Sequence, residues 1–148
     1  MRRLLLLAAC AVLAGCGSSG EKRLSKDEYA RRADAICVRF NREQPSLPSL
    51  QNVTVKQVEQ LASQTIPLVD RTIADLRKLA PPKDEQALAD RWIQSLHQLR
   101  VDAAKIRDRA RANDLAGVAA LVGPSQQDEK TADRLAAQLG ASVCSKPA

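Results

Sequence analysis

The side chains best suited to chemistry in this sequence are its four cysteines and its single histidine. They are Cys10, Cys16, Cys37, Cys144 and His97. Cysteine and histidine act as metal ligands, redox groups and nucleophiles, and each of these uses requires a particular spacing. The sequence contains no C-x-x-C motif, and these scattered residues do not assemble the four ligands of a structural zinc site. We therefore expect no metal centre.

Signatures of other catalytic and cofactor sites are missing as well. The sequence has no C-x-x-C-H motif for covalent haem, no glycine pattern for a dinucleotide or P-loop site, and only one histidine for a di-iron bundle. Ser95 lies near His97, but each step along a helix turns a side chain by about 100°, which points the two apart. We expect His97 to be a partly exposed structural residue, with no cofactor and no enzymatic activity.

The composition favours helices packed through small aliphatic side chains. Hydrophobic residues make up 45% of the 148 residues, whereas aromatic residues make up only 2%, namely Tyr29, Phe40 and Trp92. Alanine-rich aliphatic cores suit close helix–helix contact, and no run of strand-forming residues alternates with a period of two. These features predict an all-α domain.

The charge balance is basic but does not indicate nucleic-acid binding. Lys and Arg number 23 against 17 Asp and Glu, a formal net charge of +6. Arg107, Arg109 and Arg111 are interleaved with Asp108 and Asp114, and no aromatic residue lies near them. The excess permits mild attraction to anionic lipids or envelope polymers, and we expect no nucleic-acid partner.

Helix signals divide the rest of the sequence into successive segments. Ser25 begins a capping box and a helix that ends near Gln44. Thr54 begins a second helix, which continues through Pro67 because the apolar stripe resumes in phase beyond it and which ends ahead of the next proline pair. The third covers about residues 84–112 and carries a bundle-facing seam. The seam residues are spaced three and four apart: Ala89, Trp92, Leu96, Leu99, Ala103, Ile106 and Ala110.

The remaining segment predicts a short helix and then a long one. The short helix covers residues 115–122 and stops at Gly123-Pro124, and the last helix starts at Ser125, with Gly140 as its C-terminal cap. Four main helices with short connections most simply form an antiparallel, up-down bundle. The expected fold is therefore an all-α, up-down four-helix bundle with a short extra helix before the last one.

Residues 1–15 have the three parts of a signal peptide. Arg2 and Arg3 form a charged start, residues 4–13 form an apolar segment, and the small residues Ala14 and Gly15 follow. An apolar helix of about ten residues rises only about 15 Å, half of a roughly 30 Å hydrocarbon core. This segment predicts an export signal that is too short to span a membrane.

The sequence Leu13-Ala14-Gly15-Cys16 resembles the lipobox of bacterial lipoproteins, in which a Leu and two small residues precede an obligatory Cys. The resemblance implies diacylglycerol attachment to the Cys16 sulfur and cleavage before Cys16, so that Cys10 is discarded with the leader. Two acyl chains hold a protein stably on a bilayer. We expect lipidated Cys16 with a flexible tether over residues 16–24, and a domain over residues 25–148 that this lipid anchors outside the cytoplasm.

Such processing leaves Cys37 and Cys144 as the two unmodified cysteines. Beyond the cytoplasmic membrane an even pair predicts a disulfide, which would tie the first helix to the tail after the last one. A pair of metal ligands or redox thiols is the alternative, and the absence of a C-x-x-C motif argues against it.

Several short phrases of the sequence are similar to those of small actinobacterial envelope lipoproteins of unknown function. Such proteins carry a helical domain with one cysteine early and one at the end, and the resemblance implies that architecture here. It implies no activity. The phrases are Ser25-Lys26-Asp27-Glu28-Tyr29 through Asp34-Ala35-Ile36-Cys37, Leu79-Ala80-Pro81-Pro82, Ala112-Asn113-Asp114-Leu115-Ala116, and Leu139-Gly140 through Cys144.

Two functions follow as hypotheses. The first is a non-catalytic interaction or scaffolding module that docks to another envelope protein. The second is a carrier of a small apolar ligand, for which the helix around Pro67 would open a pocket lined by Ile66, Val69, Trp92 and Leu96. Neither the oligomeric state nor the final membrane face follows from the sequence.

Overall fold

The computed structural model describes residues 22–46 and 53–146, and in this part of the chain all the regular structure is helical. The all-α prediction is confirmed. The expected signal peptide (1–15), Cys16 and residues 17–21 lie outside the described residues. The helices are α1 (Lys26–Glu43), α2 (Val55–Leu76), the short 3₁₀ helix η1 (Lys83–Glu85), α3 (Gln86–Arg111) and α4 (Leu115–Gln138).

The first two helices begin at the capping residues that the sequence predicts. Ser25 Oγ accepts a hydrogen bond from the Glu28 amide at 3.2 Å. Thr54 and Gln57 form a reciprocal capping box, in which Gln57 Oε1 accepts from the Thr54 amide at 2.8 Å. These side chains satisfy backbone donors that a helix start leaves unpaired. Pro67 lies inside α2, and the helix continues through it as predicted.

The turn between α2 and α3 is longer than the sequence indicates. The second helix ends at Leu76, and a turn follows in which the Leu79 amide donates to the Leu76 carbonyl at 3.0 Å. The Ala80 carbonyl accepts from the Leu24 amide at 2.8 Å instead of extending the helix. Prolines 81 and 82 disfavour helical backbone at the residues before them, which keeps the turn non-helical up to η1, and α3 follows η1 directly.

The fourth helix corrects the sequence prediction. The expected stop at Gly123-Pro124 does not occur, and a single helix runs from Leu115 to Gln138 with Pro124 inside it. Pro124 has no amide hydrogen to donate, so the carbonyl of Ala120, four residues earlier, loses its helical hydrogen bond. Both residues are exposed. Water can therefore satisfy that carbonyl, and packing of α4 on α3 stabilises the long helix as a whole.

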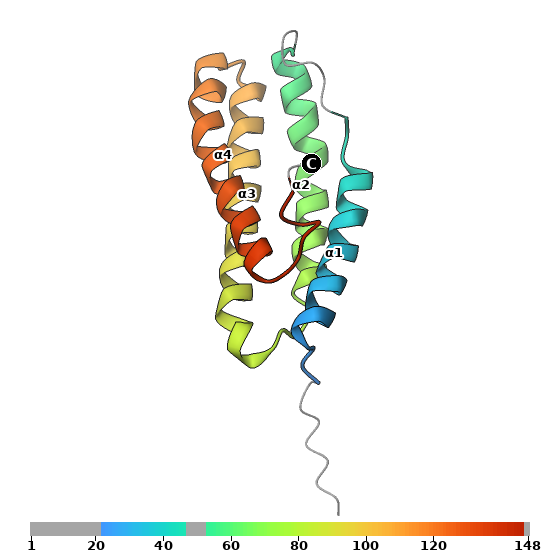
Figure 1. The fold of residues 1–148 in the computed structure, drawn as a ribbon. Coiled ribbons are helices and arrows are strands. Elements are labelled where there is room, and N and C mark those ends of the chain that lie inside the picture. The colour runs from blue at the N-terminus through green and yellow to red at the C-terminus, as the bar shows by residue number, and fades with distance from the viewer. Residues whose placement is uncertain (1–21, 47–52, 147–148) are drawn as a thin grey trace, which may run out of the picture.

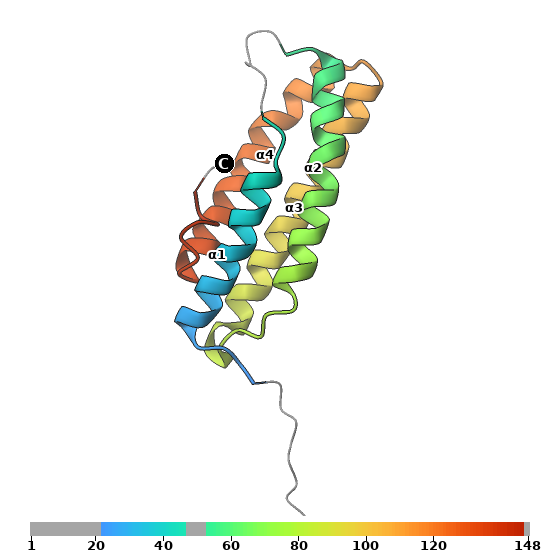
Figure 2. The ribbon, with the colours of Figure 1, turned by 90° about the vertical axis from the view of Figure 1, so that its right-hand side faces the viewer.

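The long helices lie side by side, and the turn between α2 and α3 lies at the opposite end of the molecule from the turn between α3 and α4 (Figures 1 and 2). Their main contacts follow chain order: α1 packs on α2, α2 on α3, and α3 on α4. The described chain starts beside the turn between α2 and α3, at the lower end of Figure 1. Arg23 and Leu24, which the sequence places in the flexible tether, are bound to this turn through the carbonyls of Pro81 and Ala80.

The tail after α4 returns along the bundle towards α1, as the red segment of Figure 1 shows. Gly140 has φ +79°, the left-handed conformation expected of a helix cap. The Gly140 amide donates to Ala137 and the Ala141 amide to Ala136, both at 3.0 Å, which is the Schellman arrangement. This cap turns the chain so that Ala141 is fully buried and the residues after it reach α1.

The main core lies in the half of the bundle nearest the tether. Its largest fully buried side chains are Trp92, Tyr29, Leu76 and Leu139. Around them pack alanines of three helices, which let the backbones approach closely. The predicted seam of α3 is buried at its two ends, at Ala89 and Trp92 and again at Ala110, whereas its middle is only half-buried. The middle of the seam therefore faces an incompletely filled space.

Candidate functional site

A partly open pocket of about 240 Å³ lies among the helices beside the main core, with which it shares Trp92 and Ala132. All four long helices and the C-terminal tail contribute to its lining, and we call it the bundle cavity. Its apolar walls come mostly from the half-buried middle of the α3 seam and from the facing residues of α1 and α2. These apolar residues are Phe40, Val69, Trp92, Leu96, Leu99, Ala103, Ala132 and Val143.

The cavity arises because small side chains and a thin tail fill the space between α1 and α4. The main helix contacts do not include an α1–α4 pair, and the tail occupies that side of the bundle. Two α2 residues that line the cavity, Thr65 and Thr72, are shorter than the leucines of α3 opposite them. A tail and short side chains fill less volume than a packed pair of helices, so space remains over the α3 seam.

The predicted pocket residues are partly confirmed. Val69, Trp92 and Leu96 line the bundle cavity as expected of a ligand site. Ile66 does not line it, although it is buried at 6% exposure. Pro67 is exposed on the opposite side of α2 and takes no part in the lining.

Cys37 and Cys144 form one edge of the cavity. The structure joins them as a disulfide with 5.3 Å between their Cα atoms, and so brings together the two cysteines that the sequence analysis paired. Asp34 strengthens the same attachment, because its Oδ1 accepts from the Val143 amide at 2.8 Å and from the Cys144 amide at 3.3 Å. These contacts hold the tail against α1 as a wall of the cavity.

Polar and charged groups complete the lining, and the exposed ones, Asn41, Glu129 and Lys146, mark its open side, which we call the mouth. Two carboxylates, Glu129 and Asp133, line it from α4, and Lys146 lines it from the tail. Burial raises the pKa of Asp133, because the carboxylate is partly removed from water beside apolar walls. Two side-chain amides, Asn41 of α1 and Gln44 directly after it, also line the cavity.

Sequence reasoning missed these mouth residues. Glu129 and Asp133 are four residues apart, which places them on one face of a helix, together with the buried Ala132. That spacing was a usable signal, but the sequence does not show what α4 faces. Asp34 was missed as well, because its partners are tail amides more than one hundred positions away.

His97 is not part of a catalytic arrangement with Ser95. The guanidinium of Arg77 donates to His97 Nε2 at 2.7 Å. The Ser95 hydroxyl donates instead to the Trp92 carbonyl one turn earlier, at 2.7 Å. The structure therefore separates the two residues, as the helical geometry predicted.

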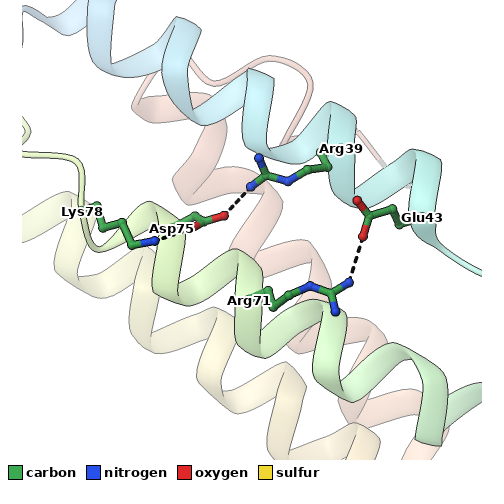
Figure 3. Close-up of polar contacts among 5 residues, drawn as sticks. All are labelled: Arg39, Glu43, Arg71, Asp75 and Lys78. Carbon is green, nitrogen blue, oxygen red and sulfur yellow. Dashed lines mark hydrogen bonds and ion pairs between the residues drawn. The ribbon is translucent and has the colours of Figure 1, made fainter.

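Ion pairs between α1 and α2 attach α1, the shorter of the two helices, to the bundle (Figure 3). Arg71 pairs with Glu43 at 2.8 Å, and Arg39 pairs with Asp75, which also binds Lys78 at 2.7 Å. The hydrogen bond from Lys78 is the main cause that lowers the pKa of Asp75. These groups lie on the outside and contribute little stability individually, so we assign them a structural role.

A pair of carboxylates lies between α3 and α4. Asp102 is 5% exposed, and its Oδ1 accepts from Gln98 Nε2 at 2.9 Å, with Lys105 Nζ 3.5 Å away. Its Oδ2 has no hydrogen-bond partner in the described part of the chain. Burial, and after it the neighbouring Asp102 carboxylate, raise the pKa of Asp128. We expect this pair to make the stability of the domain depend on pH.

Comparison with known proteins does not place the chain in a family. No protein-family model, curated protein or solved structure matches it. Within residues 22–46 and 53–146, no three or more His, Cys, Asp or Glu side chains are grouped as a metal site. Among the same residues, no helix has the length and apolar character needed to cross a bilayer. The bundle cavity is therefore the feature on which we base a function.

Proposed function

We propose that the chain is a small lipoprotein of the actinobacterial cell envelope, anchored to the membrane through acylated Cys16. The signal-like segment 1–15 and the lipobox resemblance at residues 13–16 support this proposal. Its domain, residues 25–148, is an antiparallel, up-down four-helix bundle. A disulfide between Cys37 and Cys144 suits a location outside the cytoplasm.

The bundle binds a small molecule with an apolar body and a cationic amine, without catalysing a reaction. The single observation that carries this function is the bundle cavity. Its volume of about 240 Å³ exceeds the roughly 150 Å³ of an engineered apolar cavity that binds benzene. It is smaller than the pockets of about 300–1,000 Å³ that hold drug-sized ligands. The space therefore suits one aromatic ring or a short alkyl chain.

The charges at the mouth select the polar end of the ligand. In the described part of the chain, neither Glu129 nor Asp133 forms an ion pair, although basic residues outnumber acidic ones in the sequence. An ammonium group at the mouth would pair with these carboxylates and restore the interactions that burial removes from Asp133. A fatty-acid carboxylate would be repelled by Glu129 and Asp133, and among the lining residues only Lys146 would attract it.

Intrinsic fluorescence provides a direct binding assay. Trp92 is the only tryptophan in the chain, lines the cavity and is 1% exposed. We would titrate the lipidated protein, in phosphatidylcholine vesicles, with phenethylamine, its neutral isostere propylbenzene and the anion hydrocinnamate. We expect all binding to change Trp92 emission, with phenethylamine the tightest ligand and hydrocinnamate the weakest.

Matched variants test the location and the charge preference separately. Ala103→Leu fills the cavity and should abolish the response, whereas Ala119→Leu makes the same change at an exposed α4 position and should leave it intact. Glu129→Gln and Asp133→Asn should each weaken phenethylamine binding about fivefold, the scale of one partly exposed charge pair. They should leave propylbenzene binding unchanged.

The outcomes separate the alternatives. Equal binding of all three probes would retain an apolar-ligand carrier and reject the amine preference. No binding of any probe would reject the carrier function. In that event, in-cell crosslinking of the lipidated protein to one dominant envelope protein would support the interaction or scaffolding function instead.

A further inference from the structure

We propose a second site, at the tether end of the bundle, that binds anionic phospholipid headgroups and docks the domain upright on the membrane surface. It is separate from the bundle cavity. It rests on the proposed lipid anchor, but not on the proposed ligand. The site is an open hollow of about 640 Å³ formed by the turn between α2 and α3 and by Arg23. We call it the basic hollow.

The basic hollow collects cations from three separate segments. Arg23 comes from the start of the described chain, Arg77 and Lys78 from the end of α2, and Lys83 from η1. Among residues 22–46 and 53–146, no carboxylate lines it. Lys78 is neutralised by Asp75 at 2.7 Å, whereas Arg23, Arg77 and Lys83 form no ion pair within the described residues. Three uncompensated cations around one hollow favour an anionic group.

The guanidinium groups are positioned rather than free to extend into solvent. Arg23 Nη1 donates to the Pro81 carbonyl at 2.9 Å and to Gln86 Oε1 at 2.8 Å. Arg77 is held by His97 Nε2 at 2.7 Å. Neutral acceptors therefore hold both groups in place and leave their positive charges uncompensated. An arginine held in this way loses less side-chain entropy when it binds a phosphate.

The place of the hollow in the fold selects a membrane surface as the partner. Figure 1 shows that the described chain begins at the end of the molecule that carries the α2–α3 turn. Seven residue steps separate Cys16 from Arg23, which span at most about 25 Å. An acyl chain on Cys16 therefore keeps the basic hollow close to the headgroups, where each Lys or Arg gains attraction to anionic lipid. Glu85, an acidic residue of η1 near the hollow, already forms an ion pair with Lys26, so its charge is neutralised in part.

The test measures the height of the domain above the bilayer. Energy transfer from Trp92, the only tryptophan, to dansyl-labelled lipid reports that height for the lipidated protein in vesicles. We would compare pure phosphatidylcholine vesicles with vesicles that contain phosphatidylglycerol, at low and high salt. We expect transfer to be stronger with phosphatidylglycerol and to fall towards the phosphatidylcholine value at high salt.

A matched pair of lysine variants locates the contact. Lys83→Gln removes one cation from the hollow without breaking a described contact, and should lower the docked-to-undocked ratio about fivefold. Lys56→Gln makes the same change at the far end of α2, where it should have no effect. The triple variant Arg23→Gln, Arg77→Gln, Lys83→Gln should abolish the dependence of energy transfer on phosphatidylglycerol. Thermal unfolding checks that each variant remains folded.

Three results would overturn the proposal. One is energy transfer that does not depend on phosphatidylglycerol. Another is equal loss in Lys83→Gln and Lys56→Gln, which would indicate nonspecific attraction by net charge. The third is suppression by free glycerol phosphate at the concentration of the lipid phosphate, which would indicate a site for a soluble anion. Failure of the anchor itself is measured separately, because an unacylated chain would not float with pure phosphatidylcholine vesicles.

Discussion

Removing the disulfide should destabilise the domain and open the bundle cavity together. The bond joins residues 107 positions apart, and closing a loop of that length restricts the unfolded chain by about 4–5 kcal/mol in the chain-entropy model. For a domain of this size that loss lowers the Tm by roughly 15–20 °C. Val143 and Cys144 line the cavity, so a tail released from α1 should also expose Trp92.

Thermal unfolding by circular dichroism and acrylamide quenching of Trp92 measure the two effects. The double variant Cys37→Ser, Cys144→Ser should unfold at the lower temperature and be quenched more strongly than the oxidised protein. Reductant should bring the oxidised protein to the same values and leave the double variant unchanged. If the Tm falls as expected while quenching stays constant, the tail is not a wall of the cavity. A loss of only a few degrees would contradict the entropy argument.

Substitutions at other positions should raise or lower the stability of the domain. Gly123→Ala should raise the free energy of unfolding by about 0.5–1 kcal/mol, since a Cβ there meets nothing within 4 Å. Gly117→Ala should lower it, because its Cβ would lie 2.2 Å from Oδ2 of Asp114, the carboxylate whose other oxygen caps α4. Urea unfolding compares the two. Asp34→Ala should cost about 1–3 kcal/mol by leaving tail amides without an acceptor, and hydrogen exchange should show faster exchange confined to the tail. The pKa of Asp128 is raised above its ordinary 3.8, first by burial and then by Asp102, so the folded state binds more protons. Stability should therefore fall as pH rises from that ordinary value through the raised one. Asp128→Asn should remove this fall and raise the Tm at neutral pH, whereas an unchanged pH profile would contradict the carboxylate-pair interpretation.

Local signals predicted the starts of α1 and α2. The caps at Ser25 and Thr54 depend on side chains within three residues of the amides that they bind, so the sequence contains all the required information. Gly140 as the cap of α4 is equally local. Pro67 was predicted to lie inside a helix because the apolar stripe resumes beyond it.

Pro124 shows where local signals fail. Glycine and proline side by side ordinarily end a helix, yet α4 continues through them. The cost of the proline falls on the exposed carbonyl of Ala120, and α4 is half-buried on both sides of the proline, at Leu121 and Ser125, and packs on α3. The sequence does not show which face of a helix is exposed at the break.

The sequence by itself determined the helical class, the starts of the first two helices and the pairing of two cysteines, because these depend on composition, near neighbours and the number of thiols. Tertiary structure decided the continuity of α4, the bundle cavity and the basic hollow. The hollow joins cations from residues 23, 77 and 83, and the cavity joins five segments of the chain. Cavities are the differences between closely matched volumes, so they become defined only when the helices and the tail are packed together.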